Sequence, residues 1–205
     1  MTSVGDAFGW PFQDPGWFGK IIVQGLIFII PIVGWIALYG WLVLLIDNYR
    51  AGRHELPPAG FHLGRGVALF VVYLVWLIVF NIPGGVLSGL GSSNQNGGLA
   101  GLGSLLDFVL GLVLAFLVPA IFLNTYRTGF SGGFDISGIW TMATSNVSTS
   151  VVAGLLILVA SIISGLGVIV CCVGLLFTIP YGAAIIAGVV TWYEQALARP
   201  APATG

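Results

Sequence analysis

The sequence predicts an all-α integral membrane protein with five or six membrane segments, proline-interrupted helices and a short interfacial helix. Composition is the first observation: of 205 residues, 58% are hydrophobic and only 6% are charged. A soluble domain carries about 25% charged residues, because its surface must be wetted. Six Lys+Arg and seven Asp+Glu residues are too few for that, so the apolar side chains must face lipid and each other.

The length of the apolar runs is the second observation. A bilayer core of about 30 Å needs about 20 helical residues at about 1.5 Å each. The block from Val151 to Trp192 would be roughly 60 Å long as one helix, so it must fold back at Gly165-Leu166-Gly167. We therefore expect one membrane domain over residues 1–205, with an interfacial segment at 1–20 and a flexible tail at 198–205. The expected membrane segments are 21–46, 66–82, 105–123, 149–164 and 168–194.

Prolines and glycines lie within these segments or at their ends. Three segments contain a proline (Pro31, Pro119 and Pro180), and the second segment stops at Pro83-Gly84-Gly85. Residues 84–104 are uncharged and rich in Gly, Ser and Asn, which predicts a flexible loop. Within 124–150, apolar residues at helical spacing predict a short helix in the headgroup plane (Ile136, Ile139, Trp140, Ala143 and Val147).

Basic residues predict the orientation, because loops rich in Lys and Arg stay in the cytoplasm. Five arginines fall in connections that alternate to one side of a plasma (inner) membrane, which we assign to the cytoplasm together with the C-terminus (Arg50, Arg53, Arg65, Arg127 and Arg199). Lys20 leaves two arrangements open. If residues 21–46 cross once, Lys20 lies outside and there are five spans. If Pro31 to Gly34 turns a hairpin or re-entrant pair, all six basic residues lie inside, and we favour this second arrangement.

A loose internal repeat marks two helix ends. Asn48-Tyr49-Arg50-Ala51-Gly52 ends the first apolar region, and Thr125-Tyr126-Arg127-Thr128-Gly129 ends the third. In such a unit, Tyr sits at headgroup level, Arg reaches water or lipid phosphate, and Gly ends the helix. We therefore expect contacts with the interface or lipid headgroups at a small set of residues: Tyr49, Arg50, Tyr126, Arg127 and Trp140.

Chemistry that needs ionisable groups inside the membrane has few candidate residues here. Asp47 and Glu194 lie at helix ends, where solvated interfacial roles are expected. We expect Asp107 to open the third helix and meet its N-terminal dipole. Three amides within or beside the spans are expected to hydrogen-bond between helices (Gln24, Asn81 and Asn124). We accordingly predict no catalytic residues.

No cofactor or metal site is predicted either. His54 and His62 both lie in a charged connection, away from mid-membrane depth, and zinc would need two more ligands from Glu55 or Asp135. The adjacent Cys171 and Cys172 fall inside an apolar run and are interpreted as small buried hydrophobes. A net charge of −1 provides no basic field for nucleic acid.

Several short motifs resemble a known family, the bacterial and archaeal membrane proteins of domain of unknown function 4013. The similar features are the Phe12…Asp14-Pro15-x-Trp17…Lys20 opening, Ile30-Pro31-Ile32-Val33-Gly34-Trp35, Tyr39-Gly40, Tyr49-Arg50, Leu56-Pro57 and Gly174-Leu175-Leu176-x-x-Ile179-Pro180. The resemblance implies a multi-span membrane protein and implies no activity.

These observations lead to three functional hypotheses. The first is a non-catalytic accessory or scaffold subunit that packs against membrane lipids or other membrane proteins, because buried polar chemistry is scarce while small and aromatic residues abound. The alternative is a small transporter or channel, since proline-interrupted helices and a loose repeat occur in transporter folds. A lipid-modifying enzyme that uses Arg50, Arg127, His54 and His62 ranks last.

Overall fold

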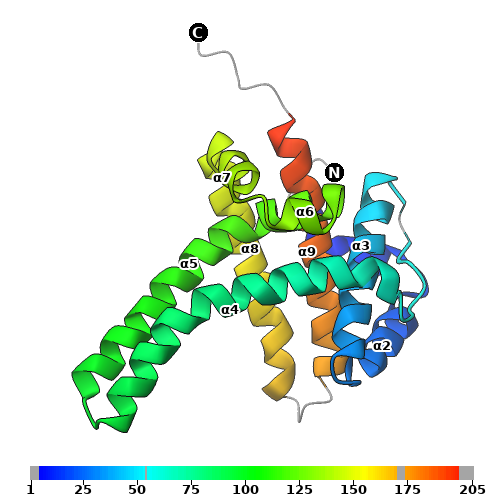
Figure 1. The fold of residues 1–205 in the computed structure, drawn as a ribbon. Helices are drawn as coiled ribbons and strands as arrows, with labels where there is room; N and C mark the ends of the chain where they lie inside the picture. Colours follow the sequence, from blue (N-terminus) through cyan, green and yellow to red (C-terminus); the bar gives the residue numbers. More distant parts are fainter. Residues whose placement is uncertain (1–4, 54, 170–173, 199–205) are drawn as a thin grey trace.

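The computed structural model describes residues 5–53, 55–169 and 174–198, and within these ranges it contains helices and no strand (Figure 1). The all-α class is therefore confirmed. The elements are α1 Asp6–Gly9, η1 Trp10–Gln13, α2 Trp17–Phe28, α3 Val33–Arg50, α4 Leu63–Ser93, α5 Gly97–Thr128, α6 Phe130–Gly133, α7 Ile136–Ser145, α8 Val147–Leu166, η2 Gly167–Ile169 and α9 Leu175–Leu197.

Four helices in the described ranges, α4, α5, α8 and α9, are long and apolar enough to cross a membrane. Three of the predicted segments contain or border a proline that lies inside a continuous helix, at Pro83 in α4, Pro119 in α5 and Pro180 in α9. The second segment therefore does not stop at Pro83. Membrane helices tolerate proline because neighbouring groups satisfy the freed backbone carbonyl.

The first apolar stretch is not one helix but two, α2 and α3, which fold back on each other. Lys20 Nζ donates to the carbonyl oxygen of Leu56 at 2.7 Å, so the start of α2 lies beside the residues that follow α3. Gly34 allows this turn, since a Cβ there would lie 2.2 Å from the carbonyl oxygen of Ile27. With 12 residues, α2 is about 18 Å long, too short to cross a bilayer core of about 30 Å.

The prediction of a flexible loop over residues 84–104 was wrong. α4 continues to Ser93 and α5 begins at Gly97, so only residues 94–96 join the two helices. The glycines serve close packing instead: a Cβ on Gly103 would lie 2.4 Å from the Ser88 amide nitrogen, and one on Gly91 would lie 2.2 Å from that of Ala100. Small residues at such contacts let membrane helices approach closely, and this composition cannot be distinguished from that of a loop.

Helix α9 lies at the centre of the fold, where it packs against α2, α3 and α8 and the N-terminal residues (Figure 1). Its packing face consists largely of small buried residues: Gly182, Ala183, Ala184, Ala187 and Gly188. A Cβ on Gly188 would lie 2.7 Å from the Cβ of Ala7 and 2.8 Å from the Tyr49 hydroxyl. Residues from α1, α3 and α9 therefore meet in one core.

The predicted short helix after the third segment is present as α7. Asp135 caps it, because its Oδ1 accepts a hydrogen bond from the Gly138 amide at 2.9 Å. Val147, which the spacing also assigned to this helix, begins α8 instead. The predicted last segment begins within η2, and its residues 170–173 lie outside the described residues. The same holds for His54 and for most of the predicted C-terminal tail, and residues 170–173 include Cys171 and Cys172.

Candidate functional site

The two Tyr-Arg helix ends meet at one end of the fold. Arg50 ends α3, and Arg127 lies in the last turn of α5. Both guanidinium groups donate to the same oxygen, Oε1 of Glu194 on α9, at 2.5 Å from Arg50 and 2.7 Å from Arg127. One carboxylate therefore joins the ends of two helices to a third, and cations near a helix C-terminus also interact favourably with its dipole.

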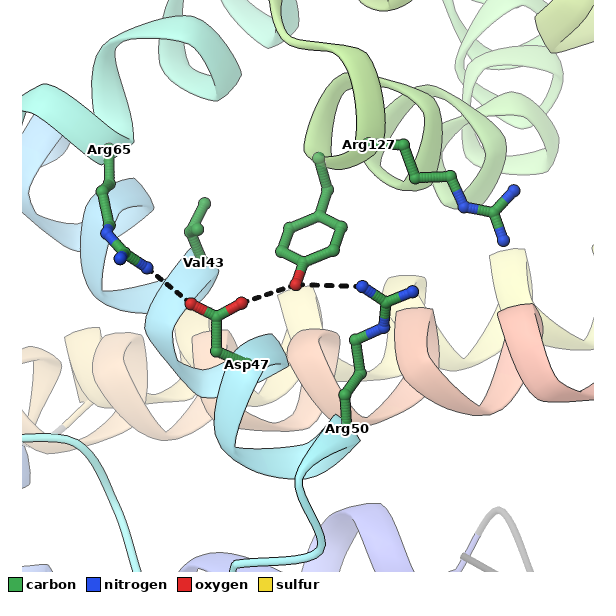
Figure 2. Close-up of a pocket in the computed structure, with 6 residues that line it drawn as sticks. Val43, Asp47, Arg50, Arg65 and Arg127 are labelled. Carbon is green, nitrogen blue, oxygen red and sulfur yellow. Dashed lines mark hydrogen bonds and ion pairs between the residues drawn. The ribbon is translucent and has the colours of Figure 1, made fainter.

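Tyr126 extends this network to α4. Its hydroxyl donates to Asp47 Oδ1 at 2.5 Å and accepts from Arg50 Nη1 at 3.1 Å, while Asp47 Oδ2 accepts from Arg65 Nη1 at 2.5 Å (Figure 2). The Arg50 guanidinium also lies 5.0 Å from the centroid of the Tyr126 ring, within the range of a cation–π contact. Charge-assisted hydrogen bonds thus run without a break from α4 to α9. We call these six residues the arginine cluster: Asp47, Arg50, Arg65, Tyr126, Arg127 and Glu194.

Five residues of the arginine cluster, all except Glu194, line an open cavity of about 480 Å³ together with Val43. The cluster as a whole holds three guanidinium groups and two carboxylates, which leaves one net positive charge. The side chains of all three arginines are partly exposed, with 41% for Arg50, 57% for Arg65 and 42% for Arg127. A guanidinium presents five N–H donors in a planar fork that matches carboxylate and phosphate oxygens. The geometry therefore suits an anionic group such as a phosphate.

Two of the five residues expected at the headgroups, Tyr49 and Trp140, lie outside the arginine cluster. Tyr49 is buried, its ring stacks on Trp10 with centroids 3.9 Å apart, and its hydroxyl reaches the carbonyl oxygen of Ala7 at 3.3 Å. Trp140 is 56% exposed on α7, outside the arginine cluster. The structure thus brings together Arg50, Tyr126 and Arg127, and adds Asp47, Arg65 and Glu194. The spacing of Asp47 and Arg50, three residues apart on one helix face, was the available signal for this addition.

A second polar cluster holds the N-terminal segment against the loop after α3. Asp14 is buried, and its carboxylate accepts from Lys20 Nζ at 2.6 Å, the Gly16 amide at 2.7 Å and the Leu56 amide at 2.8 Å. Burial by itself raises the pKa of Asp14, but the hydrogen bonds from Lys20, Gly16 and Leu56 outweigh it, so that the pKa lies below its ordinary value. Gln24 adds a further tie by accepting from the Gly60 amide at 3.0 Å.

The position of Asp107 differs from the prediction. It does not open a helix, because α5 begins ten residues earlier at Gly97, about 15 Å away along the helix axis. Its Oδ1 is buried against Gly84 of α4, and no hydrogen-bond partner lies within the described residues. A carboxylate inside a membrane-length helix is costly and is a candidate functional group. The prediction placed the start of α5 too late, because the glycine-rich stretch before Asp107 resembled a loop.

Three amides were expected to hydrogen-bond between helices, and for Asn81 this prediction was wrong. Asn81 donates to the carbonyl oxygen of Leu77 in its own helix at 2.8 Å, and Asn124 donates to that of Gly132 at 2.9 Å. Gln24 is fully buried, and its amide nitrogen has no partner among the described residues. Over the same residues, no group of three or more His, Cys, Asp or Glu side chains is arranged to hold a metal ion.

The structure is that of a polytopic membrane protein: its long helices are apolar, they pack through glycines as membrane helices do, and charged residues lie at helix ends. Comparison with known families identifies it more closely. The chain belongs to the family described as "Protein of unknown function (DUF4013)", whose sequence model matches residues 23–173. The resemblance seen in the sequence motifs is therefore confirmed. No curated protein and no solved structure matches the chain.

Proposed function

We propose that this protein is a non-catalytic membrane subunit that packs against lipids and other membrane proteins. The α4–α5 hairpin is the observation that carries the proposal. Its far half projects away from the other helices (Figure 1), and large apolar side chains there are exposed on both helices: Ile78, Val79, Ile82, Val86, Leu90, Leu102, Leu105, Phe108, Val109 and Leu112. A 31-residue helix is about 46 Å long, well beyond a bilayer core of about 30 Å, so this arm is long enough to reach a neighbouring protein.

A pair of matched substitutions tests the role of the hairpin. Leu102 on α5 is 59% exposed and Leu155 on α8 is 55% exposed, so Asn at either position carries a similar cost in lipid. We expect native mass spectrometry after extraction in a mild detergent to show an assembly with bound lipid or partner subunits. Leu102→Asn should weaken that assembly and Leu155→Asn should not. A wild-type protein that migrates only as a free monomer, or that turns over a substrate, contradicts the proposal.

We further propose that the end bearing the arginine cluster faces the cytoplasm of a plasma membrane. All the lysines and arginines of the described ranges belong to this end or to the loop beside it: Lys20, Arg50, Arg53, Arg65 and Arg127. This asymmetry follows the positive-inside rule. The short α2 then enters the membrane and returns with α3 as a re-entrant pair, while the exposed α7 lies at the headgroups of the same side.

Labelling of single cysteines tests this orientation. Gln95→Cys at the hairpin tip should react with a membrane-impermeant maleimide in intact cells, and Phe12→Cys should react only after permeabilisation. Both variants are made in a background in which Cys171 and Cys172 are replaced by Ser. The reverse labelling pattern would show that the arginine cluster faces outward.

A small transporter or channel is the second candidate. The observation that favours it is the buried Oδ1 of Asp107, which has no hydrogen-bond partner among the described residues. In proteoliposomes, an ion or solute flux that Asp107→Asn abolishes would support transport. The comparison variants are Asn81→Leu and Asn124→Leu, whose amides are engaged in local hydrogen bonds. If the flux does not exceed that of empty liposomes, the accessory role is the better account.

A further inference from the structure

Two adjoining cavities lie among the helices, away from the arginine cluster. The inner cavity has a volume of about 150 Å³ and is bounded by α3, α4, α5, α8 and α9. The outer cavity has a volume of about 220 Å³ and is bounded by α2, α3 and α4. Leu38, Tyr39 and Tyr73 line both, so the two spaces meet at these three side chains.

The walls are almost wholly apolar and aromatic. Tyr39 lies 6.0 Å from Tyr73 and 6.2 Å from Phe122 between ring centroids, and Tyr73 meets Phe122 edge to face at 5.2 Å. Phe70 and Trp35 continue the aromatic wall of the outer cavity, with centroids 6.5 Å apart. Such walls receive flat or extended apolar groups and reject charged ones.

The tyrosine hydroxyls are the polar feature of this space. A tyrosine hydroxyl inside a protein normally has a hydrogen-bond partner. Among the described residues, neither Tyr39 nor Tyr73 makes a side-chain hydrogen bond, whereas other tyrosines of the core do, such as Tyr49 and Tyr193. The serines in the wall are engaged, since Ser161 and Ser164 each donate to a carbonyl of their own helix at 2.9 Å. Two donors are therefore available to an acceptor carried by a ligand.

The outer cavity connects this space to the side of the fold. Trp35 is 46% exposed and Leu74 is 36% exposed, and both line the outer cavity between α3 and α4. A ligand that enters here comes from the lipid phase and not from water. An apolar cavity of roughly 150 Å³ holds a molecule the size of benzene, so the inner space takes one six-membered ring.

We propose that this pair of cavities binds a lipid-soluble quinone: its ring occupies the inner cavity, a ring carbonyl accepts hydrogen bonds from Tyr39 and Tyr73, and its apolar tail leaves past Trp35 and Leu74. The ligand class follows from the chemistry of the walls, which combine space for one ring, two neutral donors, no charge and an exit into lipid. This site is independent of the assembly proposed for the hairpin and of the arginine cluster.

Binding of decyl-1,4-benzoquinone, whose ring carries only the alkyl tail, to the purified protein tests the proposal, with quenching of tryptophan fluorescence as the readout. We expect saturable quenching, whose amplitude falls in Trp35→Phe. A neutral hydrogen bond contributes a factor of roughly 2 to 12 to an equilibrium constant, so Tyr39→Phe and Tyr73→Phe should each weaken binding by about that factor. Ser161→Leu fills the inner cavity and should abolish binding. The matched control is Tyr181→Phe, because this hydroxyl donates to the carbonyl of Phe8 at 3.0 Å, outside the cavities.

The outcomes that overturn the proposal are equally specific. The site is refuted if the wild-type protein does not bind, if the Tyr39→Phe/Tyr73→Phe double variant binds as tightly as the wild type, or if decanol, which lacks the ring, competes at the same concentration. A variant whose thermal unfolding midpoint equals that of the wild type is folded, so its loss of binding does not arise from misfolding. If Ser161→Leu fails to fold, the two tyrosine variants still decide the result.

Discussion

The close contact between α4 and α5 gives a prediction that two single-residue changes can test. A Cβ on Gly103 would lie 2.4 Å from the Ser88 amide nitrogen and 2.8 Å from the Gly84 carbonyl oxygen, whereas a Cβ on Gly101 would meet nothing within 4 Å. Ordinary van der Waals contact begins at 3.4 Å. Gly103→Ala must therefore move the two helices apart by about an ångström, and overpacking of this kind costs about 1–3 kcal/mol.

Both substitutions gain the same helix propensity, about 0.8–1.0 kcal/mol for Gly→Ala. We therefore expect Gly101→Ala to be neutral or slightly stabilising, and the free energy of unfolding of Gly103→Ala to lie about 1–3 kcal/mol below it. Equilibrium unfolding by SDS titration in mixed micelles measures this difference. Equal stabilities of the two variants would show that the helices do not touch at Gly103, and would return residues 84–104 to the loop that their composition suggests.

Further predictions concern the charged groups. Glu194→Gln removes the negative charge that Arg50 and Arg127 share. Because exposed pairs contribute about 0.2–1 kcal/mol each, the free energy of unfolding should fall by roughly 0.4–2 kcal/mol, and by less when Arg50→Gln is already present. The pKa of Asp14 is lowered in the folded state, so its contribution is present above the ordinary value of 3.8 and is lost as the pH falls below it. Asp14→Asn should therefore lower the thermal unfolding midpoint near neutral pH. In this variant the midpoint should also decrease less than in the wild type when the pH falls below 3.8, and an equal decrease in the two proteins contradicts the reasoning. Arg127→Gln should retain less anionic lipid in native mass spectra than Arg53→Gln, which alters an arginine outside the cluster; equal retention argues against headgroup binding.

Hydropathy was sufficient to predict the fold class because lipid demands that every spanning backbone group be satisfied within a helix. It did not predict the helix boundaries of the hairpin. A glycine-rich sequence is equally typical of a loop and of a close contact between helices. Only the positions of Gly84, Gly91 and Gly103 against the facing helix distinguish the two structures. The error displaced Asp107 from the interior of α5 to its start, so a buried carboxylate was interpreted as a cap.

The candidate site was predicted in part, through the repeated Tyr-Arg pair. The repeat correctly indicated helix ends, since Gly52 and Gly129 follow them with positive φ values of 65° and 71°. It could not show that Tyr126 turns toward charged groups while Tyr49 turns into the core. That difference depends on Trp10, which stacks on Tyr49, and a contact across 39 residues leaves no local signal in the sequence.

The central place of α9 also has a consequence for biosynthesis. A ribosome delivers this helix after the other described helices, yet Glu194 accepts from both Arg50 and Arg127, and the Tyr181 hydroxyl donates to the carbonyl of Phe8. Until α9 enters the membrane, the arginines of α3 and α5 lack their common carboxylate and the N-terminal segment lacks the surface on which it rests. The described tertiary structure therefore forms only after α9 has been translated, and a nascent chain that stops before Leu175 would expose an incomplete core to the machinery that inserts and degrades membrane proteins.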